Sequence, residues 1–332
     1  MFDDLPRAPL ATLPTPLETA APMPNSAARL WVKRDDLTGL GGGGNKARKL
    51  EFLCGDALEA GARSLITVGA AQSNHCRMTA AAGARLGLEV HLILSGDAPE
   101  PPGTETGNQL LSKMFGAQMH YTGAAESHWG QLEIAREALT DQLAGEGLAP
   151  YSIPIGGSTA VGGLGYAAAF VELIDQCEAA DRMPSAIVFT SSSGGTHAGL
   201  LAGRAALIAS GRLTADTAPD VVAIGVAKGV VMGLPDIAEL ADGVLDLMGV
   251  AARVDPNDIE VDGRWIGDDY AVPTAAGDAA VEWAAMANGL LVDRTYSGKG
   301  LSGLLGLAAE GRWSADDDVV FIHTGGWPAL FA

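Results

Sequence analysis

The stretch Gly41-Gly42-Gly43-Gly44-Asn45-Lys46-Ala47-Arg48-Lys49-Leu50 follows a strand-like run, Leu30–Lys33, and opens a predicted helix, Lys46–Leu58. Consecutive glycines permit unusual backbone angles and allow the main chain to approach a ligand closely. A lysine at the point where such a loop becomes a helix is poorly explained as an ordinary surface charge. An amine that must reach a carbonyl carbon and form a Schiff base explains it better. Lys46 is therefore the first candidate for a catalytic residue.

Working outward from this loop, short apolar runs alternate with helical patterns, which indicates an α/β fold built from βαβ units. Several of the runs are almost continuously apolar, as expected of parallel strands that are covered on both faces. The predicted strands are Ser64–Val68, Leu88–Leu94, Gln118–Tyr121, Tyr151–Ile153, Ala186–Thr190, Val221–Val226 and Val319–His323. The predicted helices are Lys46–Leu58, Asn74–Leu86, Ser127–Ala144, Ala160–Cys177, His197–Ala209, Ala275–Ala287 and Gly300–Ala309.

The composition narrows the class of protein. A length of 332 residues favours about two domains, and a hydrophobic content of 48% fits a well-packed globular chain. The net charge of −19 argues against nucleic-acid partners and against anionic membrane surfaces. The widely spaced Cys54, Cys76 and Cys177 fit reduced thiols better than a disulfide framework. Since the sequence from Met1 to Pro6 lacks the pattern of a signal peptide, we expect a cytoplasmic protein.

The glycine run also matches two nucleotide-binding patterns formally. The run Gly39–Gly44 fits GxGxxG, but the acidic residue required at the end of the next strand is missing. The P-loop pattern fails because Asn45 precedes Lys46 and Ala47 stands at the Ser/Thr position. A dehydrogenase therefore ranks last among the functions considered, and a flexible loop with a solvated lysine is the simpler alternative.

A second loop of small residues follows the predicted strand Ala186–Thr190 and reads Ser191-Ser192-Ser193-Gly194-Gly195-Thr196-His197. Exposed backbone N–H groups, hydroxyl donors and the positive end of a helix dipole together suit a phosphate group. Ordinary N-capping needs only one such residue, and the run is longer than that. Because the loop contains no lysine, it is predicted to hold the phosphate of a cofactor rather than a nucleoside triphosphate.

Further polar residues stand at predicted loop or strand ends. Gln72-Ser73-Asn74-His75 begins a helix, where N-capping is the simpler explanation. Tyr270 and Tyr296 precede helical runs, and packing with a surface hydroxyl would also explain them. His323-Thr324-Gly325-Gly326 ends a strand, at the edge where α/β proteins bind ligands. No HExxH or CxxC spacing supports a metal site, so no metal is expected and the histidines are predicted to be structural.

Taken together and in this order, these segments resemble the family of pyridoxal-phosphate enzymes that contains D-cysteine desulfhydrase and 1-aminocyclopropane-1-carboxylate deaminase. The matching stretches span nearly the whole chain: 33–36, 43–51, 72–75, 154–158, 195–200, 296–299 and 323–326. The resemblance implies two open α/β domains, as in the tryptophan synthase β-subunit, with pyridoxal 5′-phosphate in the cleft between them. The large domain would comprise residues 1–52 and 161–332, and the small inserted domain residues 53–160. It also implies a small amino-acid substrate and a homodimer.

Matched motif by motif, the resemblance assigns roles to individual residues. Lys46 would hold the pyridoxal aldehyde as a Schiff base and, once released, take the Cα proton of the substrate. Ser73 would lie near the substrate, and Tyr270 and Tyr296 would face substrate and cofactor. The remaining cofactor contacts would be Asn74 at the ring 3′-oxygen, Ser193, Gly194, Gly195 and Thr196 at the phosphate, and Ser297 and Thr324 near the pyridine nitrogen.

Two positions bear on the choice of reaction within the family. Ring-opening deaminases typically carry Glu and Leu where this chain has Ser297 and Thr324, so the chain is more similar to the desulfhydrase-type members. A neutral hydroxyl leaves the ring nitrogen unprotonated more often, which suits β-elimination better than ring opening. The predicted reaction converts D-cysteine to pyruvate, sulfide and ammonia. An L-cysteate sulfo-lyase, a 1-aminocyclopropane-1-carboxylate deaminase and a non-catalytic carrier of the same fold stay open as alternatives.

Overall fold

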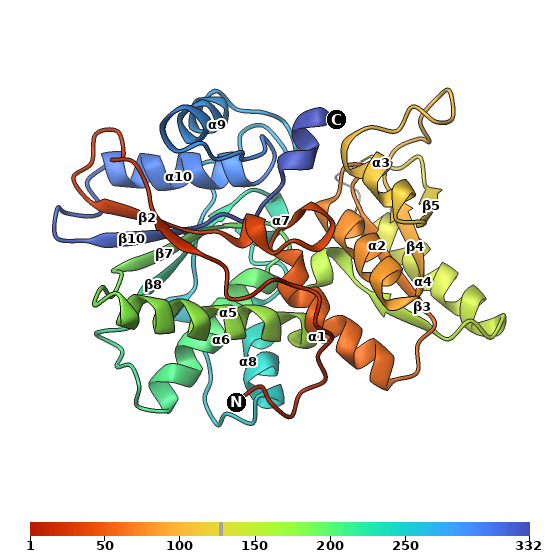
Figure 1. Ribbon diagram of the computed structural model, residues 1–332, viewed down its shortest axis with the longest axis horizontal. Coiled ribbons are helices and arrows are strands. Elements are labelled where there is room, and N and C mark those ends of the chain that lie inside the picture. Colours follow the sequence, from red (N-terminus) through yellow and green to blue (C-terminus); the bar gives the residue numbers. More distant parts are fainter. Residues whose placement is uncertain (126–128) are drawn as a thin grey trace.

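The apolar runs of the sequence form two mainly parallel sheets in the computed structural model, which describes residues 1–125 and 129–332. The larger sheet has the spatial order β1 (Leu17–Thr19), β2 (Arg29–Lys33), β10 (Asp318–Ile322), β7 (Ala186–Ser191), β8 (Asp220–Gly225) and β9 (Glu260–Asp262). Its neighbouring strands are parallel except β1, which pairs antiparallel with β2. This sheet and its helices, the larger unit, lie on the left in Figure 1.

The smaller sheet has the order β5 (Gln118–Tyr121), β4 (Glu89–Leu94), β3 (Ser64–Gly69) and β6 (Pro150–Ile153), with every pair parallel. With its helices it forms the smaller unit, on the right in Figure 1. Its strands fall within residues 53–160, where an inserted domain is expected, while the bounds at 53 and 160 stay a prediction. Both sheets are enclosed by helices, as the near-continuous apolar runs predicted.

Helices cover both faces of each sheet. They are α1 (Lys46–Glu59), α2 (Asn74–Leu86), α3 (Gly107–Met114), α4 (Trp129–Gly145), α5 (Ala160–Ala179), α6 (Gly195–Ala209), α7 (Lys228–Val231), α8 (Ile237–Leu247), α9 (Ala275–Asn288) and α10 (Ser297–Ala309). On the larger sheet, α9 and α10 cover one face, and α5, α6 and α8 cover the other (Figure 1). On the smaller sheet, Leu65 packs toward α1 and α2, whereas the next residue, Ile66, packs toward α4. This alternation follows from the two-residue repeat of a strand.

The predicted elements match the structure closely, with some differences. Sequence patterns did not indicate α3, the short α7, α8 or β9. Helix α8 follows Gly233-Leu234-Pro235, a segment that reads as a turn, but Asp236 caps it by accepting a hydrogen bond from the Glu239 backbone N–H at 3.0 Å. Helix α10 begins at Ser297 instead of the predicted Gly300. The predicted helix start at Ser127 lies outside the described residues.

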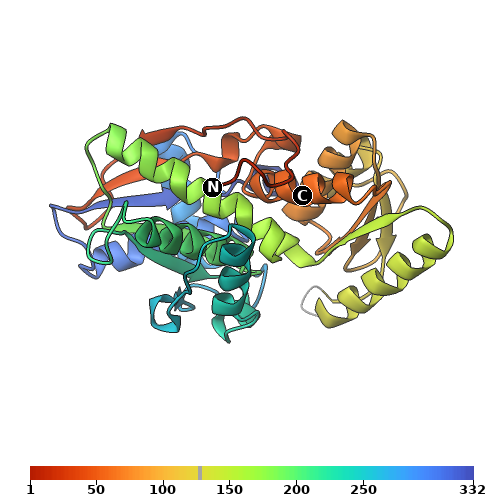
Figure 2. The same cartoon turned by 90° about the horizontal axis from the view of Figure 1, so that it is seen from below.

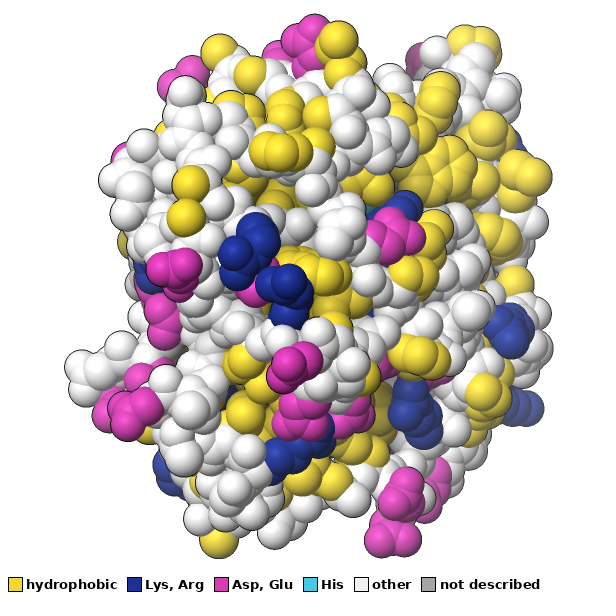
Figure 3. Space-filling model, turned by 60° about the vertical axis from the view of Figure 1, so that its left-hand side comes forward, with side chains coloured by type: hydrophobic (Ala, Val, Ile, Leu, Met, Phe, Trp, Pro, Cys, Tyr) yellow, Lys and Arg dark blue, Asp and Glu magenta, His cyan; other side chains and the backbone are white. Residues whose placement is uncertain are grey.

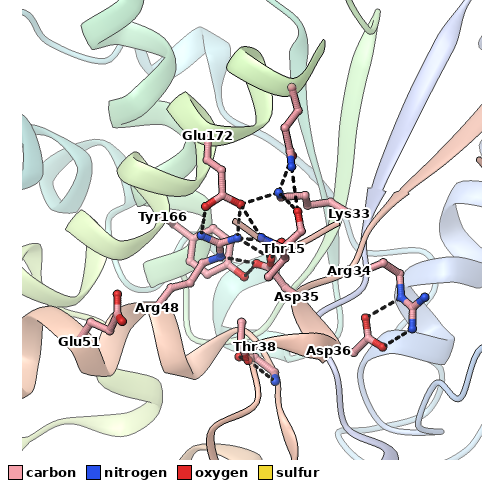
Figure 4. A network of polar contacts seen from close by, with 12 residues as sticks. Thr15, Lys33, Arg34, Asp35, Asp36, Thr38, Arg48, Glu51, Tyr166 and Glu172 are labelled. Carbon is pink, nitrogen blue, oxygen red and sulfur yellow. Dashed lines mark hydrogen bonds and ion pairs between the residues drawn. The ribbon is translucent and has the colours of Figure 1, made fainter. Parts of the chain in front are cut away.

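Helix α1, which carries Lys46, is fixed to the larger unit by a buried polar network (Figure 4). Arg48 donates to both carboxylate oxygens of Asp35 at 2.9 and 2.8 Å and to both oxygens of Glu172 on α5 at 2.8 and 3.1 Å. Lys33 on β2 also donates to Glu172 at 2.5 Å and to the carbonyl of Thr15 at 2.7 Å. Residues two apart on a helix point in nearly opposite directions. The network therefore holds Arg48 on one side of α1 and leaves Lys46 on the other.

The route of α5 links the two units. Figure 2 shows this helix running along the larger unit toward the junction with the smaller one, which it reaches next to α1.

On the face shown in Figure 3, Lys and Arg side chains stand as separated groups beside acidic ones and do not form a continuous basic stripe. Within residues 1–125 and 129–332, no helix is both long and apolar enough to span a bilayer.

Candidate active site

A cavity of about 430 Å³ lies between the two sheets, at the carboxyl ends of their parallel strands. Loops that follow β3, β6, β7, β8 and β10 all contribute to its wall. This is the edge at which open α/β sheets usually bind ligands, and the volume lies within the roughly 300–1,000 Å³ typical of small-molecule sites. The position and size of the cavity make it the candidate active site.

Most residues predicted for the site from the sequence line this one cavity. They are Lys46, Ser73, Asn74, Ser193, Gly194, Thr196, Tyr270, Tyr296 and Thr324, which come from separate segments of the chain. Two predicted residues, Gly195 and Ser297, are buried behind the wall and do not line it. The tertiary structure thus brings together residues that lie up to 278 positions apart in the sequence, from Lys46 to Thr324.

The loop before Lys46 is held in one shape by tight backbone contacts. Thr38 Oγ1 donates to the Gly44 carbonyl and accepts from the Gly44 N–H, both at 2.8 Å. At Gly43 the φ angle is +78°, and an added Cβ would stand 1.8 Å from the Asp36 carbonyl oxygen, so only glycine fits there. Lys46 is the first residue of α1 and reaches into the cavity. Burial lowers the pKa of its amine to about 8, so roughly a tenth of it is neutral and nucleophilic at pH 7, far more than for an exposed lysine.

Nitrogen and oxygen groups converge at the start of α6. Gly194, with φ +81°, is the N-cap, and the Gly195 N–H donates to Ser158 Oγ at 3.2 Å. Ser158 Oγ donates in turn to Ser193 Oγ at 2.8 Å. The side-chain nitrogen of Lys49 donates to the Gly156 carbonyl at 3.0 Å and would lie 2.5 Å from a Cβ added at Gly195. A lysine beside a helix N-terminus and a row of hydroxyls forms a cradle suited to a phosphate.

Lys49 and Ser158 were missed from the sequence, although signals for both existed. Lys49 stands three residues after Lys46, so the two amines share one face of α1. Burial and the nearby charge of Lys46 hold the pKa of Lys49 well below its usual value. The two hydrogen bonds of this buried amine go to a carbonyl and to a hydroxyl, and both partners are neutral. A phosphate anion would supply the negative partner that the amine lacks in these two bonds. Ser158 lies in the matching stretch 154–158 but was given no role.

The start of α2 presents Ser73 and Asn74 to the cavity. Ser73 caps the helix, its Oγ accepting from the Cys76 N–H at 3.1 Å, as the capping explanation predicted. Asn74 Oδ1 accepts from Arg77 at 3.0 Å and from Asn108 Nδ2 at 3.0 Å. The side-chain NH₂ of Asn74 is left as the group that can donate into the cavity. The neighbouring His75 makes a structural hydrogen bond to Thr67 at 2.8 Å.

An aromatic group forms part of the cavity wall. The hydroxyls of Tyr270 and Tyr296 hydrogen-bond to each other, and their ring centroids lie 5.9 Å apart. Trp129, at the start of α4 in the smaller unit, packs edge-on against Tyr270 with centroids 5.1 Å apart. Trp129 therefore contacts the larger unit across the cavity, which no pattern in the sequence indicated.

Ser297 has a different environment from the one the resemblance suggested. Its Oγ donates to Asp293 Oδ1 at 2.6 Å, and it lies 2.9 Å from the Gly325 carbonyl. The fully buried Asp293 also accepts from the backbone N–H groups of Tyr296 at 2.9 Å and Ser297 at 2.8 Å. Asp293, which is itself bound by Ser297, thus fixes the backbone position of Tyr296. Of the two hydroxyls predicted beside a pyridine nitrogen, Thr324 is the one that lines the cavity.

Three comparisons with known proteins agree on the family. The model of the family described as pyridoxal-phosphate dependent enzyme matches residues 9–325. The D-cysteine desulfhydrase of Klebsiella pneumoniae (strain 342) is 38% identical over 332 residues, covering 98% of this chain and 96% of the relative. The D-cysteine desulfhydrase of Salmonella typhi is also 38% identical, over 336 residues with the same coverage.

Among solved structures, the crystal structure of an ACC deaminase homologue is 34% identical, with a TM-score of 0.86 over 99% of this chain and 94% of its own. The fungal L-serine ammonia-lyase from Rhizomucor miehei has a TM-score of 0.64 at 19% identity, over 96% of this chain and 94% of its own, which reflects the shared fold alone. These similarities bear out the predicted family resemblance and the predicted fold of two open α/β units around a cofactor cleft.

The residues of the cavity fit pyridoxal phosphate. Lys46 offers an amine of lowered pKa for covalent attachment, and the cradle around Lys49 and Ser158 offers a lysine and hydroxyl donors for the phosphate. Asn74 offers an amide donor, and Thr324 a hydroxyl, at other edges of the same cavity. Together with the match over residues 9–325, this fit leads to one conclusion: the chain belongs to the family of pyridoxal-phosphate dependent enzymes.

Proposed function

We propose that the protein is a pyridoxal-phosphate dependent carbon–sulfur lyase that converts D-cysteine to pyruvate, sulfide and ammonia. The observation that carries this proposal is the polar lining of the cavity. Across the described residues, hydroxyls, amides, His75 and Lys46 supply its polar side chains, and no Asp or Glu lines it. No carboxylate is thus placed to hold a proton on the ring nitrogen, which favours elimination of a good leaving group. The 38% identity to D-cysteine desulfhydrases supports the same reaction.

Residues of the cavity have roles in this reaction that follow from their positions. The bound cofactor supplies an electron sink for the charge left on Cα. Lys46, with a pKa of about 8, can accept the Cα proton near neutral pH. The N-terminus of α2 at Ser73 and Asn74 suits the substrate carboxylate, since the backbone N–H groups there meet the positive end of the helix dipole. The paired hydroxyls of Tyr270 and Tyr296 can deliver a proton to the departing sulfur.

The proposal is tested by measuring pyruvate release from D-cysteine, L-cysteine, L-cysteate, β-chloro-D-alanine and D-serine, with 2-oxobutyrate measured from the cyclopropane amino acid in parallel. The highest kcat/KM is expected with D-cysteine, together with sulfide release. A higher value with L-cysteate and release of sulfite would replace the proposal by a sulfo-lyase. Formation of 2-oxobutyrate as the main activity would replace it by a deaminase, which the structural similarity to an ACC deaminase homologue makes the second candidate.

The lowered pKa of Lys46 predicts how the rate of cofactor attachment depends on pH. Only the neutral amine attacks the aldehyde, and its fraction grows as the pH rises through about 8. When apoprotein is mixed with pyridoxal phosphate, the rate of appearance of the visible absorbance band should therefore rise with pH and level off just above that value. A rate that levelled off only near the pKa of an ordinary exposed lysine would contradict the role of burial.

Trp129 is expected to limit the size of the substrate. Replacing Trp129 with Ala opens the wall beside Tyr270, so kcat/KM for S-substituted D-cysteines of larger size should rise by about 10-fold relative to D-cysteine, the scale on which a hydrophobic pocket discriminates. The matched control is Trp283→Ala, on α9 and outside the cavity lining, for which the ratio should stay unchanged. An unchanged ratio in Trp129→Ala would show that this side chain does not set substrate size.

We further propose the domain division at residues 53 and 160, a homodimer, and a place in the cytoplasm. The strands of the smaller sheet fall within the inserted range, which supports the division. The homodimer rests on the family resemblance, and the cytoplasmic location rests on the similarity to the D-cysteine desulfhydrases. Light scattering in solution would contradict the homodimer if it gave the mass of a single chain, and fractionation of cells would contradict the location if the protein were found outside the cytoplasm.

A further inference from the structure

Arg77 is a buried cation for which the described part of the chain offers no anionic partner. Its side chain on α2 is fully buried, and among residues 1–125 and 129–332 no carboxylate lies within ion-pair distance of it. Burial lowers the pKa of the guanidinium to about 10, a shift that the charge of the more distant Asp293 partly opposes. Burying a charge in this way costs free energy unless the surroundings use it. The reaction steps proposed above do not involve Arg77.

The hydrogen bonds of Arg77 join Asn74, which lines the cavity, to Asn108 and to the glycine loop before Lys46. Nη1 donates to Asn74 Oδ1 at 3.0 Å and to Asn108 Oδ1 at 2.8 Å. Nη2 donates to the carbonyl of Gly43 at 2.7 Å, in the loop that precedes Lys46. Each of these acceptors is neutral, and Nε has no protein partner in the described chain. Arg77 therefore ties the start of α2, helix α3 and the glycine loop to one another.

These contacts determine which end of the Asn74 amide faces the cavity. A guanidinium has donors only, so the atom of Asn74 that faces it must be the carbonyl oxygen. Asn108 reinforces this choice, because its Oδ1 is bound by Arg77 and its Nδ2 donates both to the Gln72 carbonyl at 2.8 Å and to Asn74 Oδ1 at 3.0 Å. Both acceptor sites of Asn74 Oδ1 are thereby used. Its NH₂ is left pointing away from Arg77, in a residue that lines the cavity.

We propose that Arg77 is a positioning residue that locks Asn74 as a hydrogen-bond donor to the 3′-oxygen of pyridoxal phosphate and so favours the deprotonated form of that oxygen. The proposal rests on the assignment of Asn74 to the 3′-oxygen, which is part of the proposed site. A reversed amide would turn its own carbonyl oxygen toward an anionic oxygen and repel it. Electrostatic interactions are stronger in a water-poor interior than in water, so the difference in energy between the two amide orientations is large there.

The test is a spectroscopic pH titration of the holoenzyme without substrate, in the wild type and in Arg77→Met. A hydrogen bond to the anionic form lowers the pKa of a group. Losing the locked donor should therefore raise the pH midpoint of the visible absorbance change by about one unit or more. Arg85→Met is the matched control, since Arg85 lies on the same helix but is exposed, and its one hydrogen bond within the described residues goes to the Leu10 carbonyl. Its midpoint should equal that of the wild type.

A double-mutant cycle with Asn74→Ala separates positioning from a general charge effect. If Arg77 acts through Asn74, Arg77→Met should shift the midpoint in the wild-type background and shift it far less in the Asn74→Ala background. An equal shift in both backgrounds, or no shift in Arg77→Met, overturns the proposal. Should Arg77→Met fail to fold, Asn108→Ala replaces it in the cycle. This variant removes one of the two donors to Asn74 and should raise the midpoint in the same direction by a smaller amount, and an unchanged midpoint overturns the proposal.

The two proposals can fail separately. The titration uses the bound cofactor alone, so a protein that fails to release sulfide from D-cysteine can still show the shift in Arg77→Met. Conversely, an unchanged midpoint in Arg77→Met would leave the proposed reaction with D-cysteine untouched.

Discussion

Replacing Lys46 with Ala is expected to abolish covalent attachment of the cofactor and to reduce turnover by at least roughly 10²–10⁴-fold, the usual loss when one positioned proton-transfer group is removed. In the proposed reaction Lys46 combines two roles, as the amine that attaches the cofactor and as the base that accepts the Cα proton. Burial lowers its pKa to about 8 and so prepares it for both. The measurements are the visible absorbance of the purified variant with added pyridoxal phosphate, and pyruvate release from D-cysteine.

Two controls separate the chemistry of Lys46 from its charge. Lys46→Arg keeps a positive charge but removes the nucleophilic amine, so it should be as inactive as Lys46→Ala. Lys113→Ala removes an exposed lysine that pairs with Glu105 outside the cavity lining, and it should behave as the wild type. If the Lys46→Ala protein kept both the visible band and full turnover, the assignment of the attachment residue would be wrong.

The second large effect is expected from Arg48→Met, which should destabilise the folded protein by about 3–5 kcal/mol, the usual cost of breaking a buried ion pair from one side. Arg48 and Asp35 are almost completely buried, at 2% and 1% side-chain exposure, and Glu172 is largely buried. Removing the guanidinium leaves both carboxylates with fewer donors, and of the two carboxylates Lys33 donates to Glu172 and makes no hydrogen bond to Asp35 within the described residues (Figure 4). Because the network fixes the orientation of α1, weaker binding of pyridoxal phosphate should accompany the loss of stability.

Urea unfolding of wild type and variant measures this effect. Arg212→Met is a suitable control, because Arg212 bridges Asp175 and Glu178 at the surface, where ion pairs contribute little to stability. Its unfolding midpoint should barely move, while that of Arg48→Met should fall clearly. Equal midpoints for the two variants would mean that the buried network does not anchor α1 as proposed.

Much of the fold could be predicted because local sequence patterns indicate its strands, helices and turns. Near-continuous apolar runs such as Ala186–Thr190 are the signature of strands covered on both faces, and they do become strands with helices on each side. Glycines at Gly41–Gly44 and at Gly194 indicated where the main chain must turn closely, since positive φ angles there favour glycine. Elements without such patterns, including α3 and β9, depend on packing with distant segments and were missed.

By itself the sequence determined the α/β class and the family, because both are encoded in short, ordered motifs, and it made Lys46 the candidate for cofactor attachment. Only the tertiary structure decided which side chains meet. Trp129 reaches Tyr270 across 141 positions, and Arg77 sets the direction of the Asn74 amide together with Asn108. Only the structure turned Ser297 toward Asp293 instead of into the cavity. The physical reason is that hydrogen bonds and ring contacts depend on distances of a few ångströms, and folding alone determines which distant residues come that close.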